Sequence, residues 1–462
     1  MKKQIFTPEQ RIQFGQARRK QLPRMAHGQW KASDRRHDPM KLLEESMRGR
    51  VPSLVALKYE RMACSPFGFF RGAVPVMAAD LAVMPNTTIH CQLCGDAHVR
   101  NLGAYAGSDG RLVFDINDFD ETIHGPFEWD LKRLATSLVL AGREDGVKAS
   151  ASKAAVLTFA RQYRRMVRIF AEMPVIDLAR YQIQRIGRVA TISQVLLKAE
   201  RATPLHSLMA LTVPAGPKGT AVSELGNGGP RLFREARPLL FRLRPNHARE
   251  VIESLVRYRE SLQPERQHFF SQYRPVDLAF KIVGTGSVGL RDYVIYFEGN
   301  GPADPLFLQV KEEPASAYAR YLGAEGTAEP AMHHQGRRVV DGQRAMQFQS
   351  DPFLGWTSIG ERDYLVRQLN DHKGSIEVED LSAAGLVEYA KVCGELLARG
   401  HSRSGDPCVL AGYLGNGAKF DEALASFAAA YADQTEADWK TLRKTRHLSK
   451  AAKKQPPSPT GK

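Results

Sequence analysis

One loop in the first quarter of the chain decides the fold that we expect. It reads Gly95-Asp96-Ala97-His98-Val99-Arg100-Asn101. It follows residues 88–94, whose alternation of polar and apolar side chains predicts a strand. A short loop at the end of a strand places Asp96 and Asn101 on one side. This spacing is typical of a loop whose acid orients a hydroxyl group and whose amide holds a metal ion. By itself the pattern is weak, because Asp and Asn are common loop residues.

A second polar cluster follows the next predicted strand, residues 111–116. Asp115 and then Asn117-Asp118-Phe119-Asp120-Glu121 bring four acids into seven residues. Such acids repel one another unless a cation lies between them, and Mg²⁺ prefers one or two carboxylates together with phosphate oxygens. An acidic surface turn is the alternative, although the interleaved apolar residues disfavour it. The pattern predicts Asp118 as a metal ligand, with Asp120 as a second candidate.

A glycine-rich turn lies much later, between two further predicted strands. It reads Gly284-Thr285-Gly286-Ser287-Val288-Gly289. A dinucleotide-binding turn would be followed by a helix, but residues 292–297 read as a strand. A strand, a glycine-rich turn and a second strand are typical of the hairpin that covers phosphates in kinases. Residues 306–310 then lead to Lys311, the place of a phosphate-pairing lysine. An ordinary glycine hairpin with a surface lysine is the alternative.

Together these motifs resemble the small-molecule branch of the kinase superfamily, the aminoglycoside phosphotransferase-like enzymes. That family reads Gly-Asp-x-His-x-x-Asn, then a strand, then Asp-aromatic-acid, and then an Asp-Leu pair that begins a helix. Asp130-Leu131 matches the last element, and the resemblance implies that Asp130 braces the catalytic loop. The chain departs from the family at Cys94, where a histidine is usual.

The resemblance also implies which residues form the site. It implies ATP and Mg²⁺ as cofactors, with Mn²⁺ as an alternative metal. The residues it indicates are Asp96 and His98 for catalysis, Asn101, Asp118 and Asp120 for metal binding, and Gly284, Gly286, Ser287, Gly289 and Lys311 for nucleotide binding.

In ordinary kinases the glycine-rich hairpin and the lysine precede the catalytic loop, whereas here the matching segments follow the loop 95–101. A circular permutation reconciles the two orders, because segments distant in the chain can meet in space and chain ends often lie close together. We therefore expect an α+β, bilobal protein-kinase-like fold, with a small antiparallel β-sheet lobe and a larger helical lobe in permuted order. Its expected parts are a basic, flexible segment at 1–40, a helical lobe at 41–275 that carries the catalytic and metal-binding loops, a β-rich nucleotide-binding lobe at 276–372, helices at 373–435 that complete the helical lobe, and a basic tail at 436–462.

Within these parts the local patterns predict individual elements. A helix is expected over 40–62 and a Pro/Gly-punctuated loop over 65–72. Strands are expected over 278–283, 293–297, 306–310 and 362–369, and helices over 380–400 and 420–433.

Most of the chain also resembles one bacterial family, the domain of unknown function 2252. The resemblance brings no known substrate. The matching segments cover roughly residues 40 to 435 and are Ser65-Pro66-Phe67, Phe70-Arg71-Gly72, Gly95–Asn101, Asn117–Asp120, Gly284–Gly289, Val310-Lys311-Glu312, Gln343–Gln347, Asp351–Trp356 and His401.

Two questions stay open at the level of sequence. A kinase-like site needs a Glu that pairs with its lysine, but residues 336–349 contain none; Gln343 or Gln347 could replace it, or Glu312 and Glu313 could serve. This departure keeps a non-catalytic protein as an alternative. Arg71 could bind an anion near the site or brace an acid in the fold.

Bulk composition sets the remaining expectations. The chain has 462 residues, 43% hydrophobic and 25% charged, as in soluble globular proteins. It has no apolar run long enough to span a membrane and no secretory signal. Five cysteines in so long a chain favour reduced thiols and a cytoplasmic location. Cys91 and Cys94 could bind metal or act in redox chemistry, but a pair of core thiols is favoured because no second pair exists.

The formal charge of +15 is concentrated at the two ends of the chain. Basic ends can bind nucleic acid or an anionic membrane, or can serve solubility alone. The leading functional expectation is phosphoryl transfer from ATP to a small hydroxyl- or amine-bearing acceptor. The alternatives are nucleotidyl (AMP) transfer on the same fold and a non-catalytic, pseudokinase-like binder of nucleotide or nucleic acid.

Overall fold

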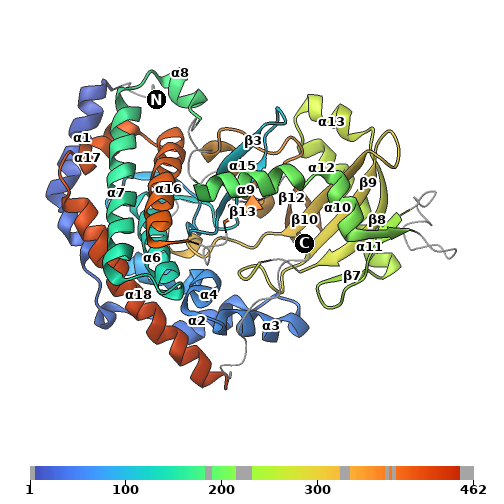
Figure 1. Ribbon diagram of the computed structural model, residues 1–462, viewed down its shortest axis with the longest axis horizontal. Helices are drawn as coiled ribbons and strands as arrows, with labels where there is room; N and C mark the ends of the chain where they lie inside the picture. The colour runs from blue at the N-terminus through green and yellow to red at the C-terminus, as the bar shows by residue number, and fades with distance from the viewer. Residues whose placement is uncertain are drawn as a thin grey trace.

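Two large hydrophobic cores organise the chain, one among helices and one on a β-sheet. The computed structural model describes residues 6–182, 190–214, 231–282, 284–322, 333–369, 374–376 and 381–447. In Figure 1 the helices that enclose the first core lie on the left and the larger sheet lies on the right. The fold is a mixed α+β fold in which every strand pairing is antiparallel.

The helical part combines helices from the N-terminal and the C-terminal regions of the chain. α16 packs along α7, α18 packs on α6 and α7, and α1 packs on α17, so the blue and red segments lie beside the teal ones in Figure 1. Because α6, α7 and α16 bury apolar faces against one another, they form the largest core of the molecule. The helices are α1 (Pro8–Gln21), η1 (Arg24–Gly28), η2 (Ala32–Asp34), α2 (Pro39–Ser46), α3 (Pro52–Ala63), α4 (Pro66–Gly72), α5 (Val74–Val83), α6 (Glu128–Glu144), α7 (Ala149–Glu172), α8 (Val175–Arg180), α16 (Ala383–Ser404), α17 (Pro407–Leu414) and α18 (Lys419–Thr445).

Two small sheets lie against these helices and carry the polar loops predicted above. β1 (His90–Leu93) pairs with β4 (Ile123–Pro126). β2 (Leu102–Ala106) pairs with both β3 (Leu112–Ile116) and β13 (Gly374–Ser375). The loop from 95 to 101 therefore joins the two sheets, and residues 117–122 join them again on the way back.

The largest sheet has six strands in the order β11-β12-β10-β9-β8-β7. One face packs on the helices that follow β7 and forms the second core. The strands are β7 (Leu240–Arg242), β8 (Arg274–Lys281), β9 (Asp292–Glu298), β10 (Pro305–Glu312), β11 (Gly355–Ile359) and β12 (Arg362–Gln368), and the helices that follow β7 are α11 (Pro245–Glu253), α12 (Leu255–Ser261) and α13 (Pro264–Phe270). The remaining elements are α9 (Ala190–Arg201), α10 (Pro204–Leu211), β5 (Thr212–Pro214), β6 (Arg231–Phe233), η4 (Ala319–Tyr321) and α15 (Gln335–Met346).

The four strands predicted around the glycine-rich turn are present as β8, β9, β10 and β12. The predicted boundary at residue 275 is wrong, however. α11, α12 and α13 were expected in the helical lobe but pack on the six-stranded sheet. Their amphipathic pattern shows that one face is buried but cannot show which partner buries it.

The segment expected to be flexible, 1–40, is instead built into the fold from Thr7 onward. The Thr7 side chain caps α1, and Gly15 lies so close to the main chain of α17 that an added Cβ would stand 2.0 Å from the carbonyl oxygen of Val409. Arg24 donates to the carbonyl oxygen of Leu414 at 2.5 Å, at the end of α17 where helix carbonyls lack partners. Several basic residues that looked like a solvated tail therefore hold helix ends.

Two further predicted elements differ from the structure. Residues 65–72 were expected to form a loop, but Ser65 caps α4 and Pro66 occupies its first turn, where proline is well tolerated. The predicted helix over 40–62 is two helices, α2 and α3, because Pro52 begins a new one. The basic tail was expected from 436, whereas α18 continues to Thr445.

Within the described residues, no single helix has the length and apolar composition needed to cross a membrane. The consecutive helices α4 and α5 meet this test only when taken together, and they are bent by 76° at the break between them.

Candidate active site

The loop from Gly95 to Asn101 is held in place by the helix that follows it. Asp130 in the first turn of α6 accepts hydrogen bonds from the main-chain nitrogens of Cys94, at 2.8 Å, and Gly95, at 3.0 Å. His401 of α16 lies 3.3 Å from the same carboxylate. Asp130 therefore has the bracing position that the sequence indicated.

The loop from Gly95 to Asn101 and the acidic loop, residues 117–121, touch each other at Gly95. Its φ angle is +80°, and an added Cβ would lie 2.1 Å from the carbonyl oxygen of Glu121. Only glycine fits there, because other residues avoid this backbone conformation and carry a Cβ. The contact fixes Asp96 relative to the acidic loop.

Asp96 is paired with a buried arginine that the sequence analysis did not single out. Arg133 of α6 donates from Nε to Oδ1 of Asp96 at 2.6 Å and also donates to the carbonyl oxygen of Phe70. Burial raises the pKa of Asp96 to about 6, although Arg133 acts against this. The Asp96 side chain remains 18% exposed, so its second oxygen, Oδ2, is the atom that an incoming group could reach.

His98 and Asn101 point back into the loop. His98 is buried, and its Nδ1 accepts a hydrogen bond from the main-chain nitrogen of Arg100 at 3.2 Å, which places the ring proton on Nε2. That Nε2 lies 3.7 Å from Oδ2 of Asp96. Burial lowers the pKa of His98 well below its ordinary value, so the ring is neutral and lies beside the Asp96 carboxylate at more than hydrogen-bond distance. Asn101 donates from Nδ2 to the carbonyl oxygen of Asp96 at 2.6 Å, which leaves its amide oxygen as the atom able to bind a metal.

Lys311 reaches the acidic loop from the six-stranded sheet. It is 3% exposed, its ammonium group pairs with the carboxylate of Asp120, and Nζ lies 3.9 Å from Oδ1 of Asp118. The nearby ammonium group lowers the pKa of Asp118 despite burial, while burial and the neighbouring Asp118 raise the pKa of Asp120 to about 6. The acidic loop and Lys311, which are distant in the chain, thus meet in the structure.

The acids around Lys311 outnumber the cations that pair with them. Glu313 is buried and neither of its carboxylate oxygens has a hydrogen-bond partner among the described residues; Oδ1 of Asp120 is likewise unpartnered. Burial and the charge of Asp120 raise the pKa of Glu313 well above its ordinary value. Unpartnered buried carboxylates are rare in folded proteins and point to a missing cation or proton.

The helix expected to supply a Glu to the lysine supplies an arginine to the acidic loop instead. Arg338 of α15 donates to the carbonyl oxygens of Asp120, at 2.8 Å, and Thr122, at 2.5 Å. Of the proposed substitutes, Gln347 donates to a carbonyl oxygen in β3, Gln343 donates to Gln347, and Glu312 pairs with Arg291 and Arg362. Among these four substitutes, Glu313 is the one whose charge raises the pKa of Lys311.

The glycine-rich turn is held by side chains of α3 and of the segment that precedes it. Lys58 of α3 is buried and donates to the carbonyl oxygen of Gly286 at 2.6 Å, and Arg61 donates to that of Gly284. Arg50 donates to the carbonyl oxygen of Val288 at 2.6 Å. An added Cβ at Gly286 would stand 3.5 Å from the carbonyl oxygen of Arg71. The turn joins β8 to β9, as expected, and includes Ser287 and Gly289.

The donor atoms of the site fit Mg²⁺ or Mn²⁺ shared with a phosphate. Asp118 carries a carboxylate that is 36% exposed, and Asn101 offers an amide oxygen; such hard oxygen donors suit these ions. The described residues hold no group of three or more His, Cys, Asp or Glu side chains that could bind a metal by themselves. A metal here would need phosphate oxygens or water to complete its coordination.

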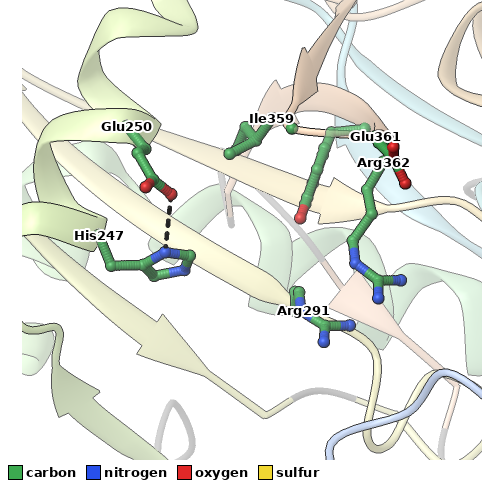
Figure 2. A pocket seen from close by; sticks show the side chains of 8 residues that line it. His247, Glu250, Arg291, Ile359, Glu361 and Arg362 are labelled. Carbon is green, nitrogen blue, oxygen red and sulfur yellow. Dashed lines mark hydrogen bonds and ion pairs between the residues drawn. The ribbon is translucent and has the colours of Figure 1, made fainter.

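A separate cavity of about 370 Å³ lies on the opposite face of the six-stranded sheet. Figure 2 shows His247 and Glu250 of α11 on one side, Arg362 and Glu361 on the other, and Arg291 below. Both arginines pair with Glu312, which points away from Lys311 because side chains alternate along β10. None of the predicted site residues lines this cavity.

Sequence reasoning missed Arg133, Lys58 and Arg338, the three buried cations that hold the loops. Each is a basic residue in a helix, where a charged side chain ordinarily faces solvent, and only the spatial position of the loops explains its burial. Cys91 and Cys94 are buried free thiols, as favoured, and His334 serves as the capping residue of α15.

Comparison with known proteins places the chain in a family without assigning an activity. The family described as "Uncharacterized protein conserved in bacteria (DUF2252)" matches residues 50–445. No curated protein and no solved structure matches the chain. Since the match covers most of the 462 residues, the chain belongs to the DUF2252 family.

Proposed function

We propose that this protein is an ATP- and Mg²⁺-dependent phosphotransferase with a circularly permuted, bilobal kinase-like fold, acting on a small hydroxyl- or amine-bearing acceptor. One observation carries the proposal: Nζ of Lys311 lies 3.9 Å from Oδ1 of Asp118. Lys311 belongs to β10 of the larger sheet, whereas Asp118 follows β3 of another sheet, far earlier in the chain. Asp96 and Asn101 lie on the loop that contacts this acidic loop.

In this proposal the nucleotide binds between the glycine-rich turn and the two polar loops. Lys311 exchanges its present partners, Asp118 and Asp120, for phosphate oxygens. Asp118 and Asn101 would hold the metal ion, whose charge would offset that of the phosphates. The uncompensated acids Asp120 and Glu313 favour such a cation.

Asp96 acts on the acceptor. Arg133 fixes Oδ1, so Oδ2 takes the proton of the acceptor hydroxyl as its oxygen bonds to the terminal phosphorus and the bond to the bridging oxygen breaks, releasing ADP. A carboxyl group with a pKa of about 6 is mostly ionised at neutral pH and remains basic enough to assist. Arg133 holds the carboxylate in position, while His98 lies beside it and stays neutral.

The test uses purified protein, Mg²⁺, ATP and a mixture of small metabolites. We expect ADP to form together with a product heavier by one phosphoryl group. Asp96→Asn and Asp118→Asn should each lower the rate by about 10²–10⁴-fold while keeping the fold. Asp109→Asn, in the turn between β2 and β3, is the control and should keep full activity.

The outcomes separate the alternatives. A product heavier by an adenylyl group would assign nucleotidyl transfer to the same site. Unchanged ATP consumption in both site variants, or no stabilisation of the wild-type protein by ATP with Mg²⁺ or Mn²⁺, would reject the proposal.

A further inference from the structure

One arginine in the candidate site has no partner in the protein itself. Arg71 of α4 forms no hydrogen bond or ion pair with any residue that the structure describes, and its Nε is buried and unpartnered. The other arginines around the loops are all engaged: Arg133 with Asp96, Arg338 with two carbonyl oxygens, and Arg367 with the carbonyl oxygen of Asn117. An arginine left unpaired inside a site is costly to the fold and suits an anionic ligand.

The charge of Arg71 acts on residues of both the loop 95–101 and the acidic loop. Its charge lowers the pKa of His98 more than any other charged group does, and its own pKa responds to both Asp96 and Asp118. Its carbonyl oxygen lies beneath Gly286 in the glycine-rich turn. The main chain of Arg71 thus lies close to the glycine-rich turn, and its buried Nε belongs to a side chain whose charge acts on both polar loops.

Within the described residues, Asp96, Asp118 and Glu144 act on this charge from nearby, but none of them forms an ion pair with it. Asp96 is bound by Arg133 and Asp118 faces Lys311. The guanidinium group of Arg100 is also near, and burial together with this like charge lowers the pKa of Arg71 to about 10. Two neighbouring cations become favourable once an anion lies between or beside them.

We propose that Arg71 binds an oxygen of the terminal phosphate of the nucleotide, the group that is transferred. This inference rests on the proposed function and assigns within it a residue for which kinase-like spacing gives no role. In transfer, the terminal phosphoryl group moves between a bridging oxygen near the metal and an acceptor oxygen near Asp96. A guanidinium group beside both acids can hold its equatorial oxygens throughout, because their charge persists in the transition state.

The experiment measures binding, so it does not need the acceptor. Dissociation constants for Mg²⁺–ATP and Mg²⁺–ADP are measured by calorimetry for the wild-type protein, Arg71→Met, Arg71→Lys and the control Arg362→Met. We expect Arg71→Met to weaken ATP binding about ten- to a hundredfold, the loss of a charged hydrogen bond, and to change ADP binding little. The ATP affinity of Arg71→Lys should lie between those of the wild type and Arg71→Met, since lysine keeps the charge but not the bidentate hydrogen-bonding geometry. Arg362→Met, which pairs with Glu312 on the other face of the sheet, should match the wild type.

A second measurement excludes a structural role. Because Arg71 has no partner in the ligand-free protein, Arg71→Met should unfold in urea at the same or a higher concentration than the wild type. A clear loss of stability would assign Arg71 to the fold and overturn the inference.

The remaining outcomes are distinct from one another. Equal weakening of ATP and ADP, or unchanged ATP binding in Arg71→Met, overturns the role of Arg71 but leaves the proposed function standing. Absence of nucleotide binding by the wild-type protein overturns both.

Discussion

Two clusters of charged side chains in this protein each combine a basic residue with several acids. They differ in whether the acids are fully paired. In the helical part, Arg35 donates to both oxygens of Asp80, at 2.9 and 2.6 Å, and to both oxygens of Asp438, at 2.8 and 3.0 Å. Around Lys311, one ammonium group faces Asp118, Asp120 and Glu313, and three carboxylate oxygens among the last two remain unpartnered.

The difference indicates what each group is for. The group around Arg35 is complete, because a planar guanidinium group matches two carboxylates and Tyr431 adds a further hydrogen bond to Asp80. The group around Lys311 is incomplete, and the side chains of Asp118 and Asp120 are partly exposed, so a ligand can complete it. We therefore expect substitutions in the group around Arg35 to lower the stability of the fold, and substitutions around Lys311 to weaken ligand binding.

The largest expected effect is on stability, at Arg35. Arg35→Met leaves the carboxylates of Asp80 and Asp438 buried without a cation, and we expect a loss of about 3–5 kcal/mol in the free energy of unfolding. Urea unfolding followed by circular dichroism measures it. Arg36→Met, at the exposed neighbouring position, should change stability by less than about 0.5 kcal/mol. Similar small losses in both variants would mean that the buried group around Arg35 is not structural.

The next effect is on binding, at Lys311. Lys311→Met removes the cation that would meet the phosphates, and we expect affinity for Mg²⁺–ATP to fall about ten- to a hundredfold. Glu312→Gln, the adjacent residue on the opposite face, should leave this affinity unchanged while weakening the pairs with Arg291 and Arg362. If Glu312→Gln lowers nucleotide affinity as much as Lys311→Met does, the two faces of β10 do not have separate roles.

The third effect concerns pH and Asp292, which lies opposite Lys311 on β9. Burial raises the pKa of Asp292 from 3.8 to about 7, and its Oδ1 is unpartnered. Between these pH values the folded state holds a proton that the unfolded state has lost, so this residue makes stability fall as pH rises. The free energy of unfolding of Asp292→Asn, relative to that of the wild type, should therefore rise by about 2–3 kcal/mol between pH 5 and pH 8.

Urea unfolding of both proteins at the two pH values measures that gain, with Asp109→Asn correcting for the loss of a charge. A constant difference between Asp292→Asn and the wild type at both pH values would contradict the inferred burial of an ionisable Asp292.

The sequence predicted the local features of the site better than their surroundings. The two polar loops and the strands beside them could be found because polar residues interrupt regular apolar patterns at Asp96 and Asp118. The meeting of Lys311 with Asp118 was predicted through spacing typical of kinases. Arg133 and Glu313 could not be predicted, because a single charged residue in a helix or at a strand end carries no sign of what it will contact.

Some elements were missed because a local signal has two meanings. Pro66 looked like a loop residue but occupies the first turn of α4, where its missing N–H has no cost. The apolar faces of α11–α13 predicted burial, but whether a helix packs on helices or on a sheet depends on distant segments. The basic residues near Arg19 read as a solvated tail, yet Arg19 donates to the carbonyl oxygen of Tyr413 at 2.7 Å.

The packing of α1 and η1 also bears on where this protein can be cut. The family match begins at residue 50, but η1 covers α18, and buried His27 lies 2.6 Å from the hydroxyl group of Tyr413 in α17. A fragment trimmed to the family boundaries would expose Tyr413 and Phe420 to water and leave the last carbonyls of α17 without Arg19 and Arg24. Expression of the domain alone should therefore start before Thr7, since α1 and η1 pack on α17 and α18 and cover their apolar side chains.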